Sequence, residues 1–179
     1  MKILKTILIV VGVIIGLILI AALFIKKEYT VKSEMQMNKP YKEVFNYIKY
    51  LKNQNDYSKW AGMDPAMEKT FTGVDGTVGF ISAWDSKQGD VGAGEQEIVA
   101  IEENKRIDFD IRFSRPFKST AKAYMTTDSL TENTTNVTWV FEGKMVYPMN
   151  IMLTVVDFDK IIGGDLETGL NNLKNILEK

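Results

Sequence analysis

The sequence predicts an α+β fold, in which helices cover one face of a curved antiparallel sheet, preceded by one N-terminal helix that spans a membrane. Three observations lead to this prediction. Residues 6–25 contain no charged side chain, residues 66–146 alternate between apolar and polar positions in short runs separated by turn residues, and the last thirty residues return to helical spacing. Strands grouped together, with helices at the ends of the chain, are typical of α+β domains.

The first predicted element is a membrane anchor within residues 1–27. Its core, Thr6 to Ile25, is twenty residues long, which as a helix spans roughly 30 Å, the thickness of the bilayer hydrocarbon. A cleaved signal peptide is the alternative, but its apolar region normally has about 7–15 residues and ends at a small-x-small site. Here the run is longer, and bulky Leu23 and Phe24 follow the alanines. We therefore expect an uncleaved, single-pass anchor.

The lysines around this segment carry little information about its orientation. Lys2 and Lys5 precede it, and Lys26 and Lys27 follow it, so the positive-inside rule gives a nearly balanced count. We expect a cytoplasmic N-terminus and an extracytoplasmic domain.

Gly12 and Gly16 form a G-x-x-x-G pattern within the apolar segment. Such a pair lets two membrane helices approach closely and would support a weak homodimer. Glycine is common in membrane helices in any case, so the pattern is equally compatible with a monomer.

Residues 28–179 have the composition of one globular domain with an acidic balance. They hold 18 of the 22 basic residues and all 23 acidic ones, which does not suit a nucleic-acid partner. The chain has no Cys and no His. Zinc sites built on sulfur or imidazole, Cys nucleophiles and Ser-His-Asp triads are therefore excluded. We expect no metal and no cofactor.

The domain is predicted to begin with a strand and a helix. Residues 29–37 alternate with the period of a half-buried strand. Asn38 follows as a predicted N-cap, and Pro40 falls near the first helical turn. An apolar stripe then predicts a helix over residues 40–52. A second short helix or irregular segment runs from there to Trp60.

A series of strands follows between residues 66 and 146. The clearest is 106–113, in which Ile and Phe occupy one face and Asp and Arg the other, as in an antiparallel sheet wetted on one side. Asp75-Gly76 marks a hairpin turn between the first two strands of the series. The predicted strands are residues 67–72, 78–84, 94–102, 106–113, 119–127 and 136–146.

The C-terminal residues predict one long helix. Apolar side chains recur there at helical spacing, namely Met152, Val156, Leu166, Leu170, Leu173 and Leu177. Gly163 and Gly164 lower the helix propensity by roughly 1 kcal/mol each relative to Ala. We expect either a bend at these glycines or the close approach of another backbone.

Short motifs in a fixed order run through residues 29–178. They are Asn38-Lys39-Pro40 with Glu43-Val44-Phe45, Tyr57-Ser58-Lys59-Trp60, Gly76-x-Val78-Gly79, Trp84-Asp85, Gly92-x-Gly94, Arg106-Ile107-Asp108, Arg112-Phe113-x-x-Pro116-Phe117, Val137-x-Trp139, Asp157-Phe158-Asp159-Lys160 and Gly169-Leu170-x-x-Leu173-Lys174. In this order and spacing the chain resembles the SRPBCC superfamily, which includes START-like, polyketide cyclase and lipid transport, and birch-pollen-allergen-like proteins. No single motif is specific, so the order over the whole domain carries the resemblance.

The resemblance implies a helix-grip fold, in which the curved sheet wraps the C-terminal helix and leaves a deep apolar cavity. It also implies a hydrophobic ligand such as a lipid, sterol or polyketide. No catalytic residue is shared across the superfamily, so the fold alone does not decide the function. We expect a membrane-anchored carrier or sensor of a hydrophobic small molecule. The alternatives are a cyclase- or dehydratase-type enzyme and a protein-interaction module of the chaperone-activator type.

The candidate cavity residues are side chains of the apolar strand faces, one amide, and two residues of the expected C-terminal helix. They are Phe80, Trp84, Gln96, Phe109, Ile111, Phe113, Met125, Trp139, Phe141, Met152 and Val156. The alternative is that these side chains pack together as a solid core. Large aromatic rings and nine methionines favour an adaptable apolar binding surface instead.

The register of residues 94–102 decides which polar groups reach this cavity. Gln96 would orient a ligand by hydrogen bonding if it shares the inward face with Ile98 and Ala100. The opposite register would bury Glu95 and Glu97 as candidate acids or bases.

Other polar candidates depend on the function. An enzyme would use a buried carboxylate, Arg112 or Tyr124 for proton transfer. Two pairs of neighbouring aromatic and acidic residues are expected at the cavity mouth, namely Trp84 with Asp85 and Trp60 with Asp64.

Overall fold

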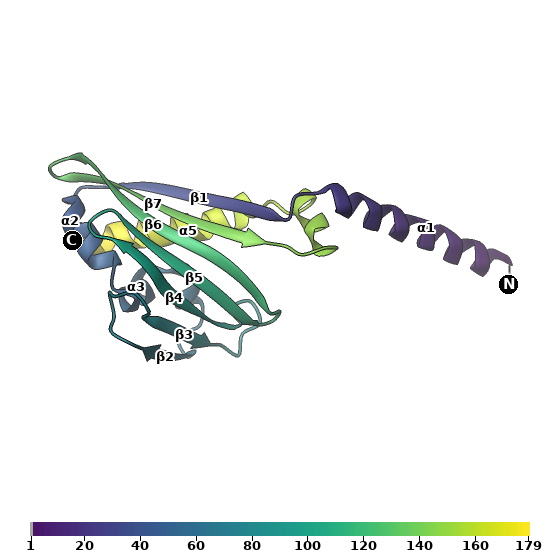
Figure 1. Cartoon of the computed structure of the whole chain (residues 1–179), viewed down its shortest axis with the longest axis horizontal. Helices are drawn as coiled ribbons and strands as arrows, with labels where there is room; N and C mark the ends of the chain where they lie inside the picture. The colour runs from purple at the N-terminus through teal and green to yellow at the C-terminus, as the bar shows by residue number, and fades with distance from the viewer. Residues whose placement is uncertain (1) are drawn as a thin grey trace.

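The computed structural model describes residues 2–179. A long helix, α1, extends from one end of a domain formed by a curved sheet and a second long helix, α5 (Figure 1). The helices are α1 (Lys2–Phe24), α2 (Tyr41–Ile48), α3 (Gln54–Tyr57), α4 (Lys59–Met63) and α5 (Phe158–Leu177), with 3-10 helices η1 (Leu51–Asn53) and η2 (Met149–Thr154). The strands are β1 (Glu28–Met37), β2 (Glu68–Thr72), β3 (Ile81–Asp85), β4 (Ala93–Glu102), β5 (Arg106–Arg115), β6 (Ser119–Thr131) and β7 (Thr134–Lys144).

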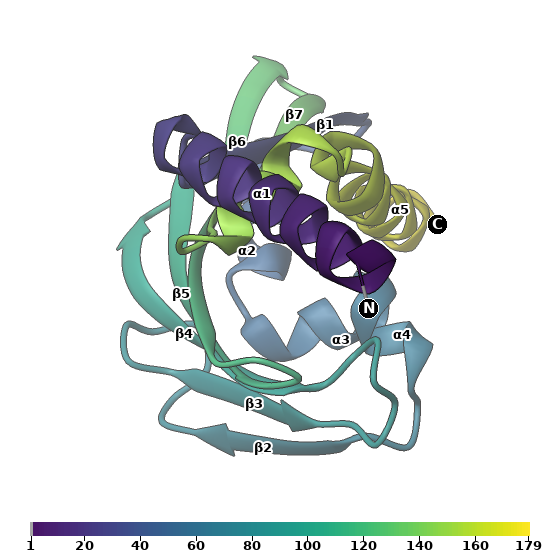
Figure 2. The same ribbon diagram turned by 90° about the vertical axis from the view of Figure 1, so that its right-hand side faces the viewer.

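These strands form a seven-stranded antiparallel sheet in the order β1-β7-β6-β5-β4-β3-β2. The first strand pairs with the last, and β2 to β7 follow one another as a meander. The sheet curves around a space that holds α5, α2, α3 and α4 (Figure 2). The α+β class and the helix-grip arrangement are confirmed.

The strand registers bring one end of the sheet next to α1. At this end, Glu28 pairs with Lys144 near one edge of the sheet, and Asp85 pairs with Ala93 and Glu68 near the other edge. We call this end of the strands the α1 end. The β2–β3, β4–β5 and β6–β7 turns lie at the opposite, distal end.

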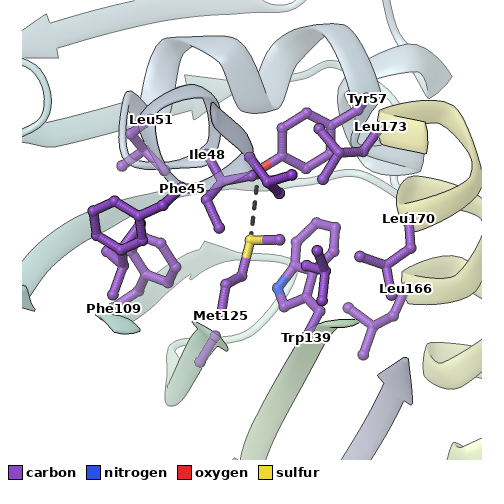
Figure 3. Close-up of a cluster of buried hydrophobic side chains, with 14 of the residues drawn as sticks. Phe45, Ile48, Leu51, Tyr57, Phe109, Met125, Trp139, Leu166, Leu170 and Leu173 are labelled. Atoms are coloured by element: carbon purple, nitrogen blue, oxygen red, sulfur yellow. Dashed lines mark hydrogen bonds between the residues drawn. The ribbon is translucent and has the colours of Figure 1, made fainter. Parts of the chain in front are cut away.

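One face of α5 packs against the inner face of the sheet. Leu166 and Leu170 are buried there beside Trp139 (Figure 3). Gly169 allows this packing, because a Cβ at this position would come within 2.8 Å of Cζ3 of the Trp139 indole. Within residues 2–179, no other backbone approaches the paired glycines closely: a Cβ at Gly163 would meet the Val31 side chain at 3.4 Å, and one at Gly164 would meet nothing within 4 Å. The Gly163 carbonyl accepts a hydrogen bond of 3.0 Å from Ser33 Oγ of β1.

Helix α5 begins later than its sequence pattern predicted. Met152 lies in η2 and Val156 in the turn before α5, so neither belongs to the C-terminal helix. Asp157 is the N-cap, and its side chain accepts a hydrogen bond from the Lys160 amide at 2.9 Å. This cap starts the helix at Phe158, because it satisfies an amide that has no partner in the helix.

The first domain helix begins within one residue of the predicted start, but its predicted N-cap is wrong. The N-cap of α2 is Pro40, which makes no side-chain cap, whereas the Asn38 amide donates a hydrogen bond of 2.6 Å to Glu178 at the end of α5. The helix ends at Ile48, and η1 follows it. The predicted strands are all present, with ends shifted by a few residues.

Helix α1 is the one helix of residues 2–179 that is long and apolar enough to cross a bilayer, a property that it shares with N-terminal signal sequences. Of its residues, only Ala22 is buried in the described structure. A Cβ at Gly12 or Gly16 would meet no atom of residues 2–179 within 4 Å apart from the adjacent backbone of α1 itself.

Candidate ligand cavity

A cavity of about 260 Å³ lies between the inner face of the sheet, the short helices α3 and α4, and the first half of α5. The helices and η1 line it with Leu51, Gln54, Asn55, Ser58, Trp60, Ala61, Ile162 and Leu166. The sheet and its loops line it with Met67, Lys69, Ser82, Ala83, Trp84, Asp90, Val91, Gln96, Ile111, Phe113, Ala123, Trp139 and Phe141.

The cavity occupies the half of the inner sheet face nearest to α1. Trp84, Phe113 and Phe141 each lie close to the α1 end of their strands and line it. Further along the same face, Phe109 and Met125 are fully buried in the core instead. There α2 and Tyr57 cover the sheet (Figure 3). The inner face is therefore solid at the distal end and hollow at the α1 end.

Six of the eleven candidate residues line this cavity, and five do not. The six are Trp84, Gln96, Ile111, Phe113, Trp139 and Phe141. Phe80, Phe109 and Met125 lie in the closed core. Met152 lies in η2, and Val156 lines a separate groove of about 500 Å³ between the end of α1 and the start of α5.

Aromatic rings form much of the cavity wall. Trp84 and Phe113 meet edge to face with ring centroids 5.9 Å apart, and Trp60 meets Trp139 in the same way at 6.3 Å. Edge-to-face pairs add about 0.5–1.5 kcal/mol beyond the area that they bury. The wall is thus apolar and held in place by ring contacts.

A β-bulge decides which polar group of β4 faces the cavity. Gln96 pairs with Ile111 and Ile98 with Phe109, all on the inner face, but the register shifts between Ile98 and Ala100. The extra residue, Val99, is exposed, and after it Ile101 packs against the core. The residues of β4 that point inward therefore switch from one alternating set to the other at the bulge: Gln96 and Ile98 before it, and Ile101 after it.

The candidate acids and bases of the enzyme alternative lie outside the cavity. On the outer face, Arg112 donates hydrogen bonds to Glu95 at 2.6 Å and Glu97 at 2.7 Å. The hydrogen bonds to Glu95 and Glu97 raise the pKa of the Arg112 guanidinium. Tyr124 lies under the Arg106 guanidinium, 3.7 Å from its ring centroid. Burial of Glu95 and Glu97 in the cavity is thus contradicted.

The polar groups of the cavity come mostly from residues that the sequence did not single out. Ser82 pairs with Gln96 across β3 and β4, and both line the cavity. Lys69 and Asp90 are the charged residues of the lining within residues 2–179. Ser82 falls in the same alternation as Trp84 and could have been found from it, whereas Asp90 comes from a loop that carries no periodic signal.

Of the four residues predicted at the cavity mouth, only the two aromatic ones belong to the cavity lining. Trp60 and Trp84 line the cavity, but Asp64 and Asp85 do not. Asp64 is buried and accepts a hydrogen bond from the Ser86 hydroxyl. This pair ties the turn after α4 to the loop between β3 and β4.

Comparison with known proteins identifies the fold. No protein-family model matches the chain, and no curated protein matches its sequence. Among solved structures, a norcoclaurine synthase from Thalictrum flavum in complex with a transition-state analogue aligns with a TM-score of 0.62 at 8% identity, covering 83% of this chain and 93% of that one. An uncharacterised protein from Rhizobium leguminosarum aligns with a TM-score of 0.59 at 15% identity, covering 85% and 95%.

A third structure, Ara h 8.0201, aligns with a TM-score of 0.53 at 12% identity and covers 82% of this chain and 97% of that one. These neighbours have the helix-grip fold of Bet v 1-like and SRPBCC proteins. At sequence identities this low, the structural similarity establishes the fold but not the function.

Proposed function

We propose that the chain is a single-pass membrane protein that binds a hydrophobic small molecule and acts as a carrier or sensor. Residues 1–27 are its anchor, and residues 28–179 form the binding domain on the extracytoplasmic side. The observation that carries the proposal is the cavity at the α1 end, with aromatic walls and the neighbouring polar groups of Gln96 and Ser82. An apolar pocket with a few convergent polar groups is the usual form of a small-molecule site.

The size of the cavity limits the ligand. About 260 Å³ is just below the range of roughly 300–1,000 Å³ typical of drug-sized ligands. A molecule of one or two rings, or the end of a longer chain, fits this space. One norcoclaurine synthase structure holds dopamine and hydroxybenzaldehyde, which are compounds of that size and which carry a polar group.

The first test asks whether the purified protein carries a ligand. The full chain, reconstituted in nanodiscs, is extracted with organic solvent, and the extract is compared by mass spectrometry with that of empty nanodiscs. We expect an apolar compound with a polar end, at close to one per chain. A matched extract with no enriched compound, together with no binding of hydroxybenzaldehyde by calorimetry, would exclude the carrier or sensor role.

A second test places the ligand in this cavity. Ala123 is buried and lines the cavity, whereas Ala100 is an exposed residue of β4. Ala123→Leu fills part of the space and should weaken hydroxybenzaldehyde binding at least tenfold, about 1.4 kcal/mol. Ala100→Leu adds the same atoms outside the cavity and should leave binding unchanged. Equal affinities for the two variants would place the ligand elsewhere.

An enzyme of the cyclase or dehydratase type is the second candidate, because Lys69 and Asp90 bring charged groups to the cavity. An ammonium or carboxylate at the edge of an apolar site can transfer protons. This candidate predicts that the bound compound changes chemically with time. Lys69→Met should then abolish the change while binding persists, and a carrier would release the compound unaltered.

A further inference from the structure

The segment that joins β7 to α5 is uncharged over twelve residues. It reads Met-Val-Tyr-Pro-Met-Asn-Ile-Met-Leu-Thr-Val-Val from Met145 to Val156. Several of its large apolar side chains face outward: Val146 is 65% exposed, Met149 58% and Val155 72%. Large exposed apolar side chains gathered in one uncharged segment are a feature of interaction sites.

This segment is fixed to the end of α1. The side-chain amide of Asn150 is fully buried and donates hydrogen bonds to the carbonyl oxygens of Ala22 at 2.7 Å and Ile25 at 2.9 Å. Carbonyls in the last turn of a helix have no partner within the helix, so Asn150 caps α1 from outside. The Met145 amide also donates to the Lys27 carbonyl at 2.7 Å. The apolar segment therefore lies beside the point where α1 enters the domain (Figures 1 and 2).

The depth of this point follows from the length of α1. Its twenty uncharged residues end at Ile25, and a helix of that length matches the hydrocarbon layer. Lys26 and Lys27 then mark the headgroup region. A segment bound to the carbonyls of Ala22 and Ile25 lies at the same level. Tyr147, which is also exposed, is a residue type enriched at this interface.

We infer that Met145–Val156 is a second membrane contact, which lies in the interfacial layer of the bilayer beside α1. The inference rests on the proposed function, in which α1 spans the membrane. The occupant of this surface is the lipid bilayer, because the surface is continuous with the membrane-spanning helix and any protein partner would have to fit between the helix base and the lipid. The contact turns the α1 end of the sheet, and with it the hollow half of the domain, toward the bilayer.

The absence of cysteine from the chain makes this inference directly measurable. Single cysteines at Met149, Val155, Leu130 and Val13 are labelled with an environment-sensitive fluorophore in full-length protein reconstituted into phosphatidylcholine vesicles. Leu130 is 51% exposed and lies near the distal end, whereas Val13 is in the middle of α1. Quenching is compared between aqueous iodide and lipids that carry a nitroxide at shallow or deep positions.

We expect the labels at 149 and 155 to be quenched by the shallow nitroxide and shielded at least fivefold from iodide relative to the label at 130. The label at 13 should respond to the deep nitroxide. Labels at 149 and 155 that behave like the label at 130, while the label at 13 is deep, would overturn the second contact and leave the anchor intact. Iodide access at 13 would instead refute the anchor.

A charge variant tests whether the exposed apolar side chains hold this segment in the lipid interface. Val155→Asp alters an exposed side chain and should leave the circular dichroism spectrum unchanged. It should raise iodide quenching of a label at Val146 at least twofold, because the carboxylate draws the segment out of the lipid interface. Two results together would overturn the inference. The label at 146 would stay shielded from iodide in dilute detergent micelles, and it would show no nitroxide quenching in vesicles. The shielding would then come from the protein itself.

Discussion

At the scale of single residues, Gln96 is the side chain best placed to select a ligand by its polar group. It faces the cavity beside apolar neighbours such as Ile111. The Gln96 side chain is half-buried and lines the cavity, so its amide is accessible from the cavity rather than sealed in the core. A ligand that bonds to this amide should lose roughly 1–3 kcal/mol when the amide is removed.

We therefore expect Gln96→Leu to weaken binding of the natural ligand about 5- to 150-fold, as measured by calorimetry. Binding of an apolar probe of the same size, such as toluene, should be unchanged or stronger. Gln36→Leu, on an exposed position of β1, is the matched control and should have no effect. A loss of toluene binding in Gln96→Leu would indicate that the substitution distorts the cavity.

The buried hydroxyl of Tyr57 makes the stability of the domain depend on pH. Its side chain is fully buried beside Trp139, and its hydroxyl contacts the Met125 sulfur at 3.5 Å (Figure 3). Burial raises the pKa of Tyr57, because the phenolate would lose its hydration. The unfolded chain releases this proton near pH 10, whereas the folded chain retains it. Unfolding at high pH therefore releases a proton, and stability falls as the pH rises above about 10.

The expected contribution is a loss of about 1 kcal/mol in the free energy of unfolding between pH 10 and 11, rising to about 1.4 kcal/mol per pH unit at higher pH. Tyr57→Phe removes this titration, so its stability should fall less steeply than that of the parent between pH 10 and 11 in urea denaturation. Tyr50→Phe, at an exposed position, controls for the loss of a hydroxyl. Parallel slopes for the parent and Tyr57→Phe would contradict this account.

The limits of sequence interpretation are clear at this scale. Alternation in β5 predicted correctly that Phe109, Ile111 and Phe113 share the inner face, because a strand has a period of two. It could not predict that Phe109 is covered by α2 while Phe113 faces a cavity, since that depends on where a distant helix packs. The bulge at Val99 was equally hidden, because both alternating sets of β4 contain apolar residues.

At the scale of secondary-structure elements, two glycines of α5 have opposite roles. A Cβ at Gly169 would come within 2.8 Å of the Trp139 ring, whereas a Cβ at Gly164 would meet nothing within 4 Å. Gly164→Ala should therefore stabilise the protein by up to about 1 kcal/mol through helix propensity. Gly169→Ala gains the same propensity but forces the indole to move, and overpacking of this kind costs roughly 1–3 kcal/mol.

We expect Gly169→Ala to be about 1 kcal/mol less stable than the parent, and to weaken binding because the displaced Trp139 ring enters the cavity that it lines. Urea denaturation and calorimetry on both alanine variants measure the two effects. Equal stabilisation by both substitutions would mean that Trp139 adjusts without strain.

The elements themselves were predictable where a local signal exists. All seven strands and the C-terminal helix follow from periodicity, and α5 begins at the Asp157 cap, which the sequence contains. The error of about six residues arose because Met152 and Val156 continue the apolar spacing backwards. Their exposed neighbours Met149 and Val155 suggest that this apolar character serves the membrane contact proposed for the segment rather than a helix.

At the scale of the whole molecule, the hollow half of the domain, helix α1 and the apolar segment all lie at one end. With α1 in the bilayer, as proposed above, a ligand would pass between the bilayer and the cavity over a short distance. The core does not depend on α1, because the buried core cluster contains only residues from Val31 onward. The domain is therefore expected to fold without α1, although removal of α1 also removes the two hydrogen bonds of the Asn150 amide.

This separation yields the last prediction. A chain that begins at Glu28 should fold cooperatively, with thermal unfolding close to that of the full chain, because it retains the whole buried cluster. It should also bind phosphatidylcholine vesicles weakly, through the exposed side chains of Met149 and Val155. In co-sedimentation, Met149→Asp and Val155→Asp should each reduce this binding about tenfold, the effect of roughly 1.4 kcal/mol. Val78→Asp introduces the same charge at an exposed site of the distal end and should not. Vesicle binding that is indifferent to the charges at 149 and 155, in a chain that is folded, would mean that α1 alone holds the domain at the membrane.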